Sequence, residues 1–425
     1  MFSEFFEYHS NTKHSYYSVR SNPNRIDWDN PPSKFKPYPN SFKKIKLDTT
    51  KENHRFIYQS AGITAKKSYP GVEYYLRINP SAGALYPNEL YFQSRNNSDI
   101  EDGIYHYDSA SNSIELLQEI SDEGIESYFG FETKQNGFIF LVSSVYYRSS
   151  WKYKNRAFRY CLLDAGHILG TLEASSYCFS KFYEIRYDFE KESLNQLFAF
   201  KSDEFFTAAF LINLNTNKDV KKVNMNLSYV NPTGEFIENE IIEKAYKDSL
   251  TTTNKKENQE SASFNYNKEV FQETILNRRS IREFSKGSMS KIEFEMIMKN
   301  ITQSIKSDMD EEVEIYYVIN RVQSMLLGLY KDGKMIKEGD LQQKAGYLCL
   351  EQDLGKSSAV TFFLTTNSKN YQAAYQKAGI IGHRLYLASN YLGYGCSGIG
   401  AYYDDEVCEF IGKNAMVLYA MAIGK

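Results

Sequence analysis

One order of secondary-structure elements is expected twice in this chain, once on each side of a polar stretch. Residues 247–265 (KDSLTTTNKKENQESASFN) have almost no apolar periodicity, which is typical of an exposed linker. Each half is expected to contain apolar strands, one long helix with apolar residues spaced by three and four, and a closing apolar strand. In the first half these segments are residues 89–93, 103–108, 137–145, 156–179 and 205–214, and in the second half they are 313–319, 328–333, 359–366, 377–393 and 415–424.

The repeat predicts two copies of one α+β unit within a single chain. A length of 425 residues suits two domains of about 150–200 residues, and a hydrophobic content of 42% is enough to bury substantial cores. We expect an N-terminal extended arm over residues 1–40, a first domain over 41–246 and a second domain over 266–425. Fused copies of this kind can pair inside one chain as the subunits of a twofold homodimer do.

Charge and hydropathy argue against several classes of function. The net charge is −3 and no basic stretch alternates with aromatic residues, so no DNA or RNA partner is expected. No apolar run reaches the roughly 18 residues that span a membrane, and the N-terminus lacks the order of a signal peptide. The five cysteines form no CxxC pair, and His167 and His383 hold equivalent places in the two long helices, which favours packing over a metal site. A cytoplasmic protein without a metal is therefore expected.

Two segments of the second half carry groups suited to a phosphate and to a flat ligand. The first, NRRSIREF (Asn277–Phe284), follows the linker at the start of a helical pattern, and its arginine forks and serine hydroxyl can contact phosphate. The second, LGYGCSGIGAYYDDEV (Leu392–Val407), is expected as a glycine-rich loop between two helices, where glycine permits close backbone approach. It lacks the preceding strand and the spacing of a dinucleotide-binding site. The plainer alternatives are a solvated helix end and a helix C-cap.

Two segments of the first half complete the set. NPSAGALYPNELYF (Asn79–Phe92) places a run of small residues between two prolines and before a strand, and small side chains let a planar ligand lie close to the backbone. WKYKNRAFRYCLLDAGH (Trp151–His167) contains Lys152 and Tyr153, which lead a helix and could carry protons if buried beside a ligand. The plainer alternatives are a tight turn that feeds a strand and a surface pair.

Taken together, these segments resemble the nitroreductase superfamily, and specifically its SagB-type azoline dehydrogenases of ribosomal-peptide biosynthesis. PSAGALYP, ELY, GIYHYD, WKY, RYCLLDAGH and GCSGIGAYYDDE occur in that family's order, over roughly residues 50–425. The resemblance implies FMN as the cofactor and tandem nitroreductase-like domains that share its site. It also implies a role for each matching position: Arg278, Ser280 and Arg282 at the phosphate; Pro80, Ser81, Ala82, Gly83 and Ala84 at the flavin from the first domain; Ser397, Gly398, Ile399 and Gly400 at the ring from the second; and Lys152 and Tyr153 as the catalytic pair.

The motifs are divided unequally between the halves. The first half lacks RRSxR and GCSGIG, and the second half lacks PSAG, so the two deficits are complementary. We therefore expect an intramolecular pseudo-dimer with one complete FMN site, one decayed site and one flavin per chain.

The resemblance implies that the chain oxidises azolines to thiazoles or oxazoles in a peptide substrate, with Lys152 or Tyr153 taking the proton. A cyclodehydratase complex is a further candidate partner. Two alternatives stay open at the level of the sequence. One is an NAD(P)H-dependent FMN reductase of dehydroamino acids, enones or nitro compounds. The other is a non-catalytic scaffold subunit of a peptide-cyclising complex, because one domain lacks half of its motifs.

Overall fold

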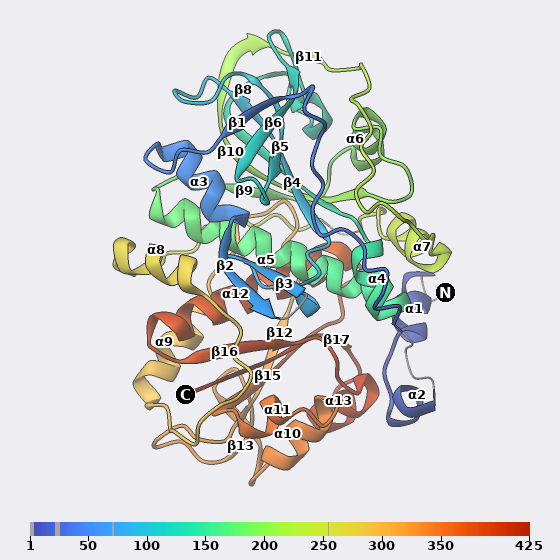
Figure 1. Cartoon of the computed structure of the whole chain (residues 1–425). Helices are drawn as coiled ribbons and strands as arrows, with labels where there is room; N and C mark the ends of the chain where they lie inside the picture. Colours follow the sequence, from blue (N-terminus) through green and yellow to red (C-terminus); the bar gives the residue numbers. More distant parts are fainter. Residues whose placement is uncertain (1–3, 22–25, 70–71, 254) are drawn as a thin grey trace.

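Two antiparallel sheets lie at opposite ends of the molecule, with two long helices between them (Figure 1). The structure, a computed structural model, describes residues 4–21, 26–69, 72–253 and 255–425. The first sheet has the spatial order β1 (Lys43–Lys46), β6 (Ser113–Glu119), β5 (Gly103–Asp108), β4 (Asn88–Arg95), β8 (Thr133–Ser144), β10 (Phe205–Asp219) and β9 (Glu184–Arg186). The second sheet has the order β14 (Lys334–Glu338), β13 (Gly328–Lys331), β12 (Glu314–Ile319), β15 (Val360–Thr366), β17 (Met416–Gly424) and β16 (Gly395–Ile399).

Smaller elements connect and cover these sheets. Two short ladders join β2 (Ile63–Tyr69) to β3 (Val72–Arg77) and β7 (Glu123–Gly124) to β11 (Lys221–Lys222). The α-helices are α1 (Glu4–Asn11), α2 (Tyr16–Ser21), α3 (Glu52–Ala61), α4 (Tyr147–Tyr153), α5 (Ala157–Cys178), α6 (Lys191–Leu197), α7 (Glu240–Asp248), α8 (Lys268–Asn277), α9 (Lys291–Ile301), α10 (Gln342–Leu348), α11 (Asp353–Ser357), α12 (Tyr371–Tyr391) and α13 (Asp404–Ile411). Single 3₁₀ turns are η1 (Ala82–Ala84), η2 (Glu126–Phe129) and η3 (Lys154–Arg156).

The long helices α5 and α12 pack directly on each other at the centre of the molecule. They approach most closely where each has a glycine. An added Cβ at Gly166 would lie 2.2 Å from the carbonyl oxygen of Gln376, and one at Gly379 would lie 2.4 Å from that of Leu163. Nearly every residue of both helices is buried, so the core of each half continues into the core of the other.

Both faces of the first sheet are covered, so even the polar residues of its central strand β4 (NELYFQSR) are buried. Every residue of β4 is buried. Leu90 and Phe92 belong to the core shared with α5, whereas Tyr91 packs on the opposite face against Phe198 and Phe206.

All ten segments expected as strands or long helices are confirmed. The largest shift is at α12, which begins at Tyr371 rather than at residue 377. Between the end of α7 and the start of α8 the described residues form no helix or extended strand, and residue 254 of the expected linker lies outside them. Among the described residues no helix has the length and apolar character needed to cross a membrane.

The N-terminal segment differs from the extended arm that the sequence predicts. Residues 1–3 and 22–25 lie outside the described residues, and the rest contains α1 and α2. The reason is tertiary packing: Tyr8 and Thr12 are buried, and the guanidinium of Arg159 on α5 donates to the hydroxyl of Thr12 at 3.0 Å. The same guanidinium pairs with Asp404 on α13 at 2.7 Å, so this segment contacts elements of both halves.

Candidate functional site

The PSAG segment forms a short turn that a buried carboxylate on α5 holds in place. The hydroxyl of Ser81 donates to Oδ2 of Asp164 at 2.5 Å, and the backbone N–H of Ala82 lies 3.3 Å from both oxygens of that carboxylate. Gly83 within the turn has φ +64°, a left-handed conformation that favours glycine. Burial raises the pKa of Asp164 to about 7.

Lys152 and Tyr153 reach this turn from the end of α4. A Cβ added to Gly83 would lie 2.7 Å from the hydroxyl of Tyr153 and 3.2 Å from Nζ of Lys152. The expectation that the pair leads a helix is wrong, because α4 ends at Tyr153 and the turn η3 separates it from α5. The ring of Tyr153 instead packs on that of Tyr160, with centroids 4.4 Å apart.

The environment shifts the pKa values of Lys152 and Tyr153 in opposite directions. Burial, and secondly the positive charge of Arg282, lower the pKa of Lys152, because both disfavour the ammonium form. Burial raises the pKa of Tyr153, so its hydroxyl keeps its proton. The pKa of the Lys152 amine is thus lowered beside a phenol, Tyr153, whose pKa is raised.

Arg278 of the RRSIR segment lies against the first half. Its Nε donates to the carbonyl oxygen of Ile78 at 2.6 Å, three residues before Ser81, and the side chain is 4% exposed. Within the described part of the chain, its Nη1 has no hydrogen-bond partner. The expectation that this segment starts a helix is wrong: α8 ends at Asn277, and Arg278 follows with ψ 127°, where the chain leaves the helix.

Tyr386 on α12 joins this segment to the glycine-rich one. Its ring lies 5.0 Å from the guanidinium of Arg278, and its hydroxyl is 2.8 Å from that of Ser280. The same hydroxyl accepts from the backbone N–H of Gly398 at 2.7 Å. Ser280 also forms a β-bridge with Cys396, so the two motifs are adjacent.

The glycine-rich segment is a strand and not the expected loop. Residues Gly395–Ile399 form β16, which pairs with β17 at the edge of the second sheet. The glycines are required by close packing: an added Cβ would lie 1.9 Å from the hydroxyl of Tyr419 at Gly398, and 2.2 Å from a ring carbon of Tyr160 at Gly400. Because Tyr160 lies on α5, this contact again joins the two halves.

The predicted site residues therefore lie in one region to which both halves contribute. Hydrogen bonding joins Arg278 to the PSAG side, the charge of Arg282 acts on Lys152, and Gly400 packs on Tyr160. Gly83, Ser280 and Arg282 are exposed, so the region is open to solvent.

The side chains present fit a phosphate-bearing flavin. Arg278 is a buried cation with an unpartnered Nη1, and a guanidinium in that state is suited to an anion such as phosphate. The exposed turn at Gly83 lies beside Lys152 and Tyr153, which are the polar groups available next to a ring bound there.

Two residues of the site were not assigned from the sequence, Asp164 and Tyr386. Asp164 belongs to the DAGH motif, which is part of the resemblance, but nothing in the sequence indicates that Asp164 bonds to Ser81. Tyr386 lies in an ordinary helical pattern, and nothing in the sequence sets it apart from other tyrosines.

The histidines of the long helices have packing partners. Nε2 of His167 is 2.9 Å from the hydroxyl of Tyr419, and Nε2 of His383 is 3.2 Å from that of Thr171. Burial lowers the pKa of His167 to about 3. Among the described residues, no three His, Cys, Asp or Glu side chains come together as a metal site would require.

A cavity of about 680 Å³ lies away from this region, beside α9 and the start of β12. Its lining mixes apolar residues such as Phe294 and Met298 with paired charges such as Lys377 and Asp310. It contains none of the predicted site residues. The chemistry therefore points to the composite region rather than to this cavity.

Comparison with known proteins agrees with the geometry. Residues 275–425, which contain Arg278 and β16, match the model of the nitroreductase family. That region is nitroreductase-like. The solved structure of a provisionally named nitroreductase from Anabaena variabilis superimposes on 100% of this chain and 99% of its own, with a TM-score of 0.80 and 24% identity. A likeness at that identity shows a shared fold, which here includes both sheets.

A curated relative gives a shorter match. A protein provisionally named as a nitroreductase in Methanocaldococcus jannaschii is 28% identical over 126 residues. The match covers 28% of this chain and 59% of that protein. The nitroreductase-like α+β fold is thus supported by sequence in the second half and by structure along the whole chain.

Proposed function

We propose that the chain is an FMN-dependent dehydrogenase that oxidises azolines to azoles in a ribosomally made peptide, at one site built by both halves as a pseudo-dimer. One observation carries the proposal: Lys152 and Tyr153 of the first half meet at Gly83, where the charge of Arg282 from the second half lowers the pKa of Lys152. A base, a proton donor and a cationic clamp come together at the turn that the resemblance assigns to the flavin.

Arg278, Ser280 and Arg282 would hold the phosphate of FMN, and the PSAG turn and residues 397–400 are the segments assigned to its ring. When bound, FMN supplies the acceptor for the hydride that leaves the azoline ring. The chain itself must orient the peptide and take up the proton that leaves the adjacent ring carbon.

Lys152 is the residue suited to take that proton. A lysine accepts a proton only in its neutral form, and its lowered pKa makes that form accessible nearer to neutral pH. Tyr153, whose pKa is raised, keeps its proton and donates a hydrogen bond to the substrate. Lys152 would thus hold the proton that leaves the ring carbon, while Tyr153 would orient the azoline.

Lys152→Ala is expected to lower the oxidation rate by about 100-fold or more, because general-base catalysis contributes about 10²–10⁴-fold. FMN content should remain that of the wild type, since Lys152 is not among the residues assigned to the phosphate. The assay follows a synthetic thiazoline-containing peptide by mass spectrometry, as the loss of two hydrogens. Lys154→Ala is the matched control, because Lys154 is exposed and its Nζ donates to the carbonyl oxygen of Trp151 at 3.1 Å. Full turnover by the Lys152 variant would refute the assignment of the base.

The rate should also depend on pH in a defined direction. kcat/KM is expected to rise with pH as Lys152 loses its proton, at a pH below the ordinary lysine pKa of about 10.4. In Arg282→Gln the positive neighbour is absent, so the pKa of Lys152 rises and the rising limb moves to higher pH. The profile is measured at saturating FMN, because Arg282 is also assigned to the phosphate. If the rising limb of the pH profile stays at the same pH in Arg282→Gln, then Arg282 does not lower the pKa of Lys152.

A second candidate is an NAD(P)H-dependent reductase, which the match of residues 275–425 to the nitroreductase family favours. This activity would show rapid oxidation of NAD(P)H with a nitro compound or an enone as acceptor. An azoline dehydrogenase does not need that donor. Comparing NADPH oxidation with the mass change of the thiazoline peptide, on the same FMN-loaded preparation, separates the two candidates.

A further inference from the structure

Lys152 and Tyr153 rest on the middle of the PSAG turn. Both side chains lie so close to Gly83 that a Cβ at that position would stand 2.7 Å from the Tyr153 hydroxyl and 3.2 Å from Nζ of Lys152. The position of the turn therefore sets the space that the two side chains share.

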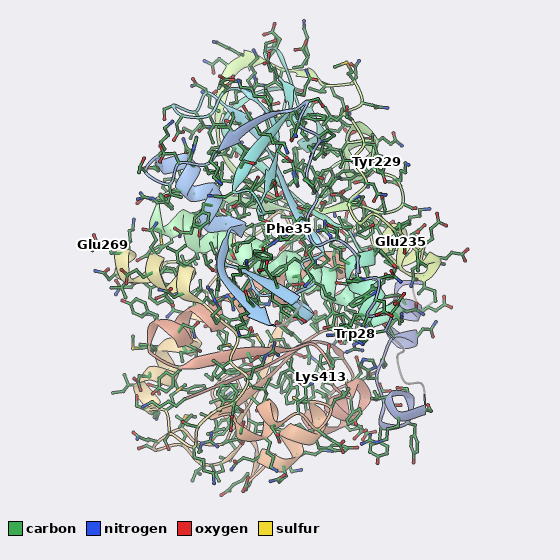
Figure 2. All side chains as sticks on the ribbon, in the orientation of Figure 1. Trp28, Phe35, Tyr229, Glu235, Glu269 and Lys413 are labelled. Carbon is green, nitrogen blue, oxygen red and sulfur yellow. The ribbon has the colours of Figure 1, made fainter. Side chains whose placement is uncertain are left out.

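The end of α4 that carries this pair is fixed independently of the turn. Nε1 of Trp151 donates to the carbonyl oxygen of Asp27 at 3.0 Å, and the Trp151 ring packs edge-on against Trp28 with centroids 5.3 Å apart. Figure 2 shows Trp28 between the two sheets, at the level where the halves meet. The ring of Tyr153 packs on that of Tyr160 on α5, with centroids 4.4 Å apart. A displacement of the turn would therefore change its spacing from the pair rather than carry the pair along.

The PSAG turn has a backbone shape that its own residues do not favour. Gly83 lies in the left-handed region, and so do two residues that carry a Cβ, Ala84 with φ +52° and Tyr86 with φ +49°. This region suits glycine and is costly for other residues, so such a conformation persists only where the surrounding contacts impose it. The shape of the turn is therefore set by what holds its two ends.

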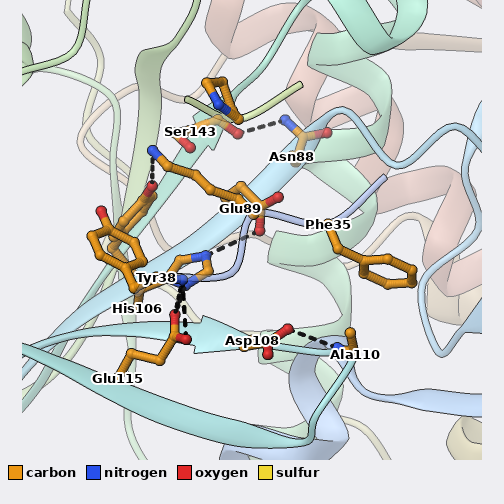
Figure 3. A network of polar contacts seen from close by, with 12 residues as sticks. Phe35, Tyr38, Asn88, Glu89, His106, Asp108, Ala110, Glu115 and Ser143 are labelled. Carbon is orange, nitrogen blue, oxygen red and sulfur yellow. Dashed lines mark hydrogen bonds and ion pairs between the residues drawn. The ribbon is translucent and has the colours of Figure 1, made fainter. Parts of the chain in front are cut away.

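The far end of the turn is held by two arginines of the first half. The backbone N–H of Arg77 donates to the hydroxyl of Tyr86, and Nη1 of Arg148 donates to the carbonyl oxygen of Tyr86, each at 3.0 Å. Arg148 also pairs with Glu89 at 2.5 Å, and Oε2 of Glu89 lies 3.2 Å from Nε2 of His106 (Figure 3). Because breaking buried ion pairs is costly, this end is expected to stay fixed when the other end is changed.

The near end of the turn is held by Asp164 on α5. The hydroxyl of Ser81 accepts from the N–H of Tyr86 at 2.9 Å, and it donates its own proton to Oδ2 of Asp164 at 2.5 Å. The N–H of Ala82 lies 3.3 Å from the same carboxylate oxygen. Asp164 is 4% exposed, and among the described residues its carboxylate forms no ion pair. The Asp164 side chain is therefore committed to the turn, through Ser81 and Ala82.

We propose that Asp164 is a positioning residue that acts through the PSAG turn on the spacing of Lys152 and Tyr153. This inference rests on the proposed function in taking that pair as catalytic. The role needs an acceptor oxygen rather than a charge, because Oδ2 alone accepts from both Ser81 and Ala82. Burial raises the pKa of Asp164 to about 7, so near neutral pH the group is present in its neutral as well as its charged form. A side-chain amide, which keeps one such oxygen, should therefore replace it.

The test uses full-length protein loaded with FMN. The variants are Asp164→Leu, Asp164→Asn, Ser81→Ala, the combination of Ser81→Ala with Asp164→Leu, and the control Asp203→Leu. Asp203 is a second buried carboxylate of the first half; it accepts from the hydroxyl of Tyr229 at 2.6 Å, and among the described residues it bonds to no part of the turn. The values of kcat and KM are measured on the thiazoline peptide by mass. Two readouts need no turnover: hydrogen exchange of the Ala82 and Tyr86 amides, and the rate at which acetic anhydride labels Lys152.

In Asp164→Leu, kcat is expected to fall about 10- to 100-fold with little change in KM, because a misplacement of about 1 Å can cost about 100-fold in rate. The two amides should exchange about tenfold faster, and Lys152 should be labelled faster, since the turn has lost its near anchor. Asp164→Asn should keep the wild-type values, and Asp203→Leu should keep the wild-type kcat. Ser81→Ala should also lower kcat, and adding it to Asp164→Leu should lower kcat no further, because both changes break one contact.

A wild-type kcat in Asp164→Leu, or a loss in Asp164→Asn equal to that in Asp164→Leu, would overturn the positioning role. So would an equal loss in Asp203→Leu, which would indicate lower stability rather than altered spacing, and so would unchanged exchange and labelling rates. If the wild type itself does not oxidise the peptide, the dehydrogenase proposal fails, whereas the exchange and labelling rates still decide whether Asp164 holds the turn against Lys152.

Discussion

Arg278→Ala protein is expected to purify almost free of flavin, with a Kd for FMN raised about 30- to 3,000-fold. The side chain is a buried cation whose Nη1 has no partner among the described residues and whose Nε is held by the carbonyl oxygen of Ile78. Truncating one member of a buried, hydrogen-bonded charge pair costs about 2–5 kcal/mol, and every 1.4 kcal/mol is a factor of about ten in Kd. Titration of apoprotein with FMN, followed by flavin fluorescence, measures the change.

Arg279→Ala provides the matched control. Its guanidinium donates to the carbonyl oxygens of Leu276, at 3.3 Å, and Arg278, at 2.5 Å, and it is not among the residues that the resemblance assigns to the phosphate. This variant should bind FMN far more tightly than Arg278→Ala does, because the Arg279 guanidinium is already paired with backbone carbonyl oxygens. Circular-dichroism melting of both variants separates loss of the phosphate clamp from loss of the fold. An Arg278 variant that melts normally and still binds FMN as the wild type does would exclude this phosphate site.

The sequence was sufficient for the elements whose periodicity is set by burial on one or both faces. The strands and long helices that were expected are present, because their apolar patterns record packing against α5, α12 and the sheets. The ends of elements were less predictable. The sequence predicts Arg278 at the start of a helical pattern, whereas α8 ends one residue before it. The start of α8 is capped by Asn267, which accepts from the N–H of Val270.

Tertiary contacts decided the remaining differences. Three glycines in residues 393–398 favour a loop by local propensity, yet β17 provides a hydrogen-bonding edge along which Gly395–Ile399 pair as β16. The hydroxyl of Tyr386 accepts a hydrogen bond from the N–H of Gly398, and the sequence near either residue gives no sign of that contact. Asp164 is comparable: its motif was visible, but its hydrogen bonds to Ser81 and Ala82 span more than 80 residues of chain.

The first sheet ends at the edge strand β9, and a buried ion pair lies near this edge rather than a ligand site. There β9 lies beside β10 as β16 lies beside β17, and residues 303–308 approach it, with Ile185 bridging Ser307. Arg384 on α12 fills this position: its Nε and Nη2 each donate to Glu173 on α5 at 2.7 Å, and Nη2 donates to the carbonyl oxygen of Ser304 at 2.9 Å. A buried ion pair therefore lies close to the place where β9 of the first half meets residues 303–308 of the second.

Glu173→Ala is therefore expected to lower the free energy of unfolding by about 3–5 kcal/mol, because it leaves the guanidinium of Arg384 buried without its carboxylate. Urea unfolding of the FMN-loaded protein, followed by circular dichroism, measures the loss. The paired replacement Glu173→Leu with Arg384→Met removes both charges, and it should restore most of the stability, since apolar replacement of a buried pair is often neutral or stabilising. Both proteins should retain one FMN per chain. A second equivalent of FMN in the paired variant would mean that this ion pair alone keeps the second position closed, whereas an unchanged unfolding midpoint in Glu173→Ala would show that Arg384 does not depend on Glu173.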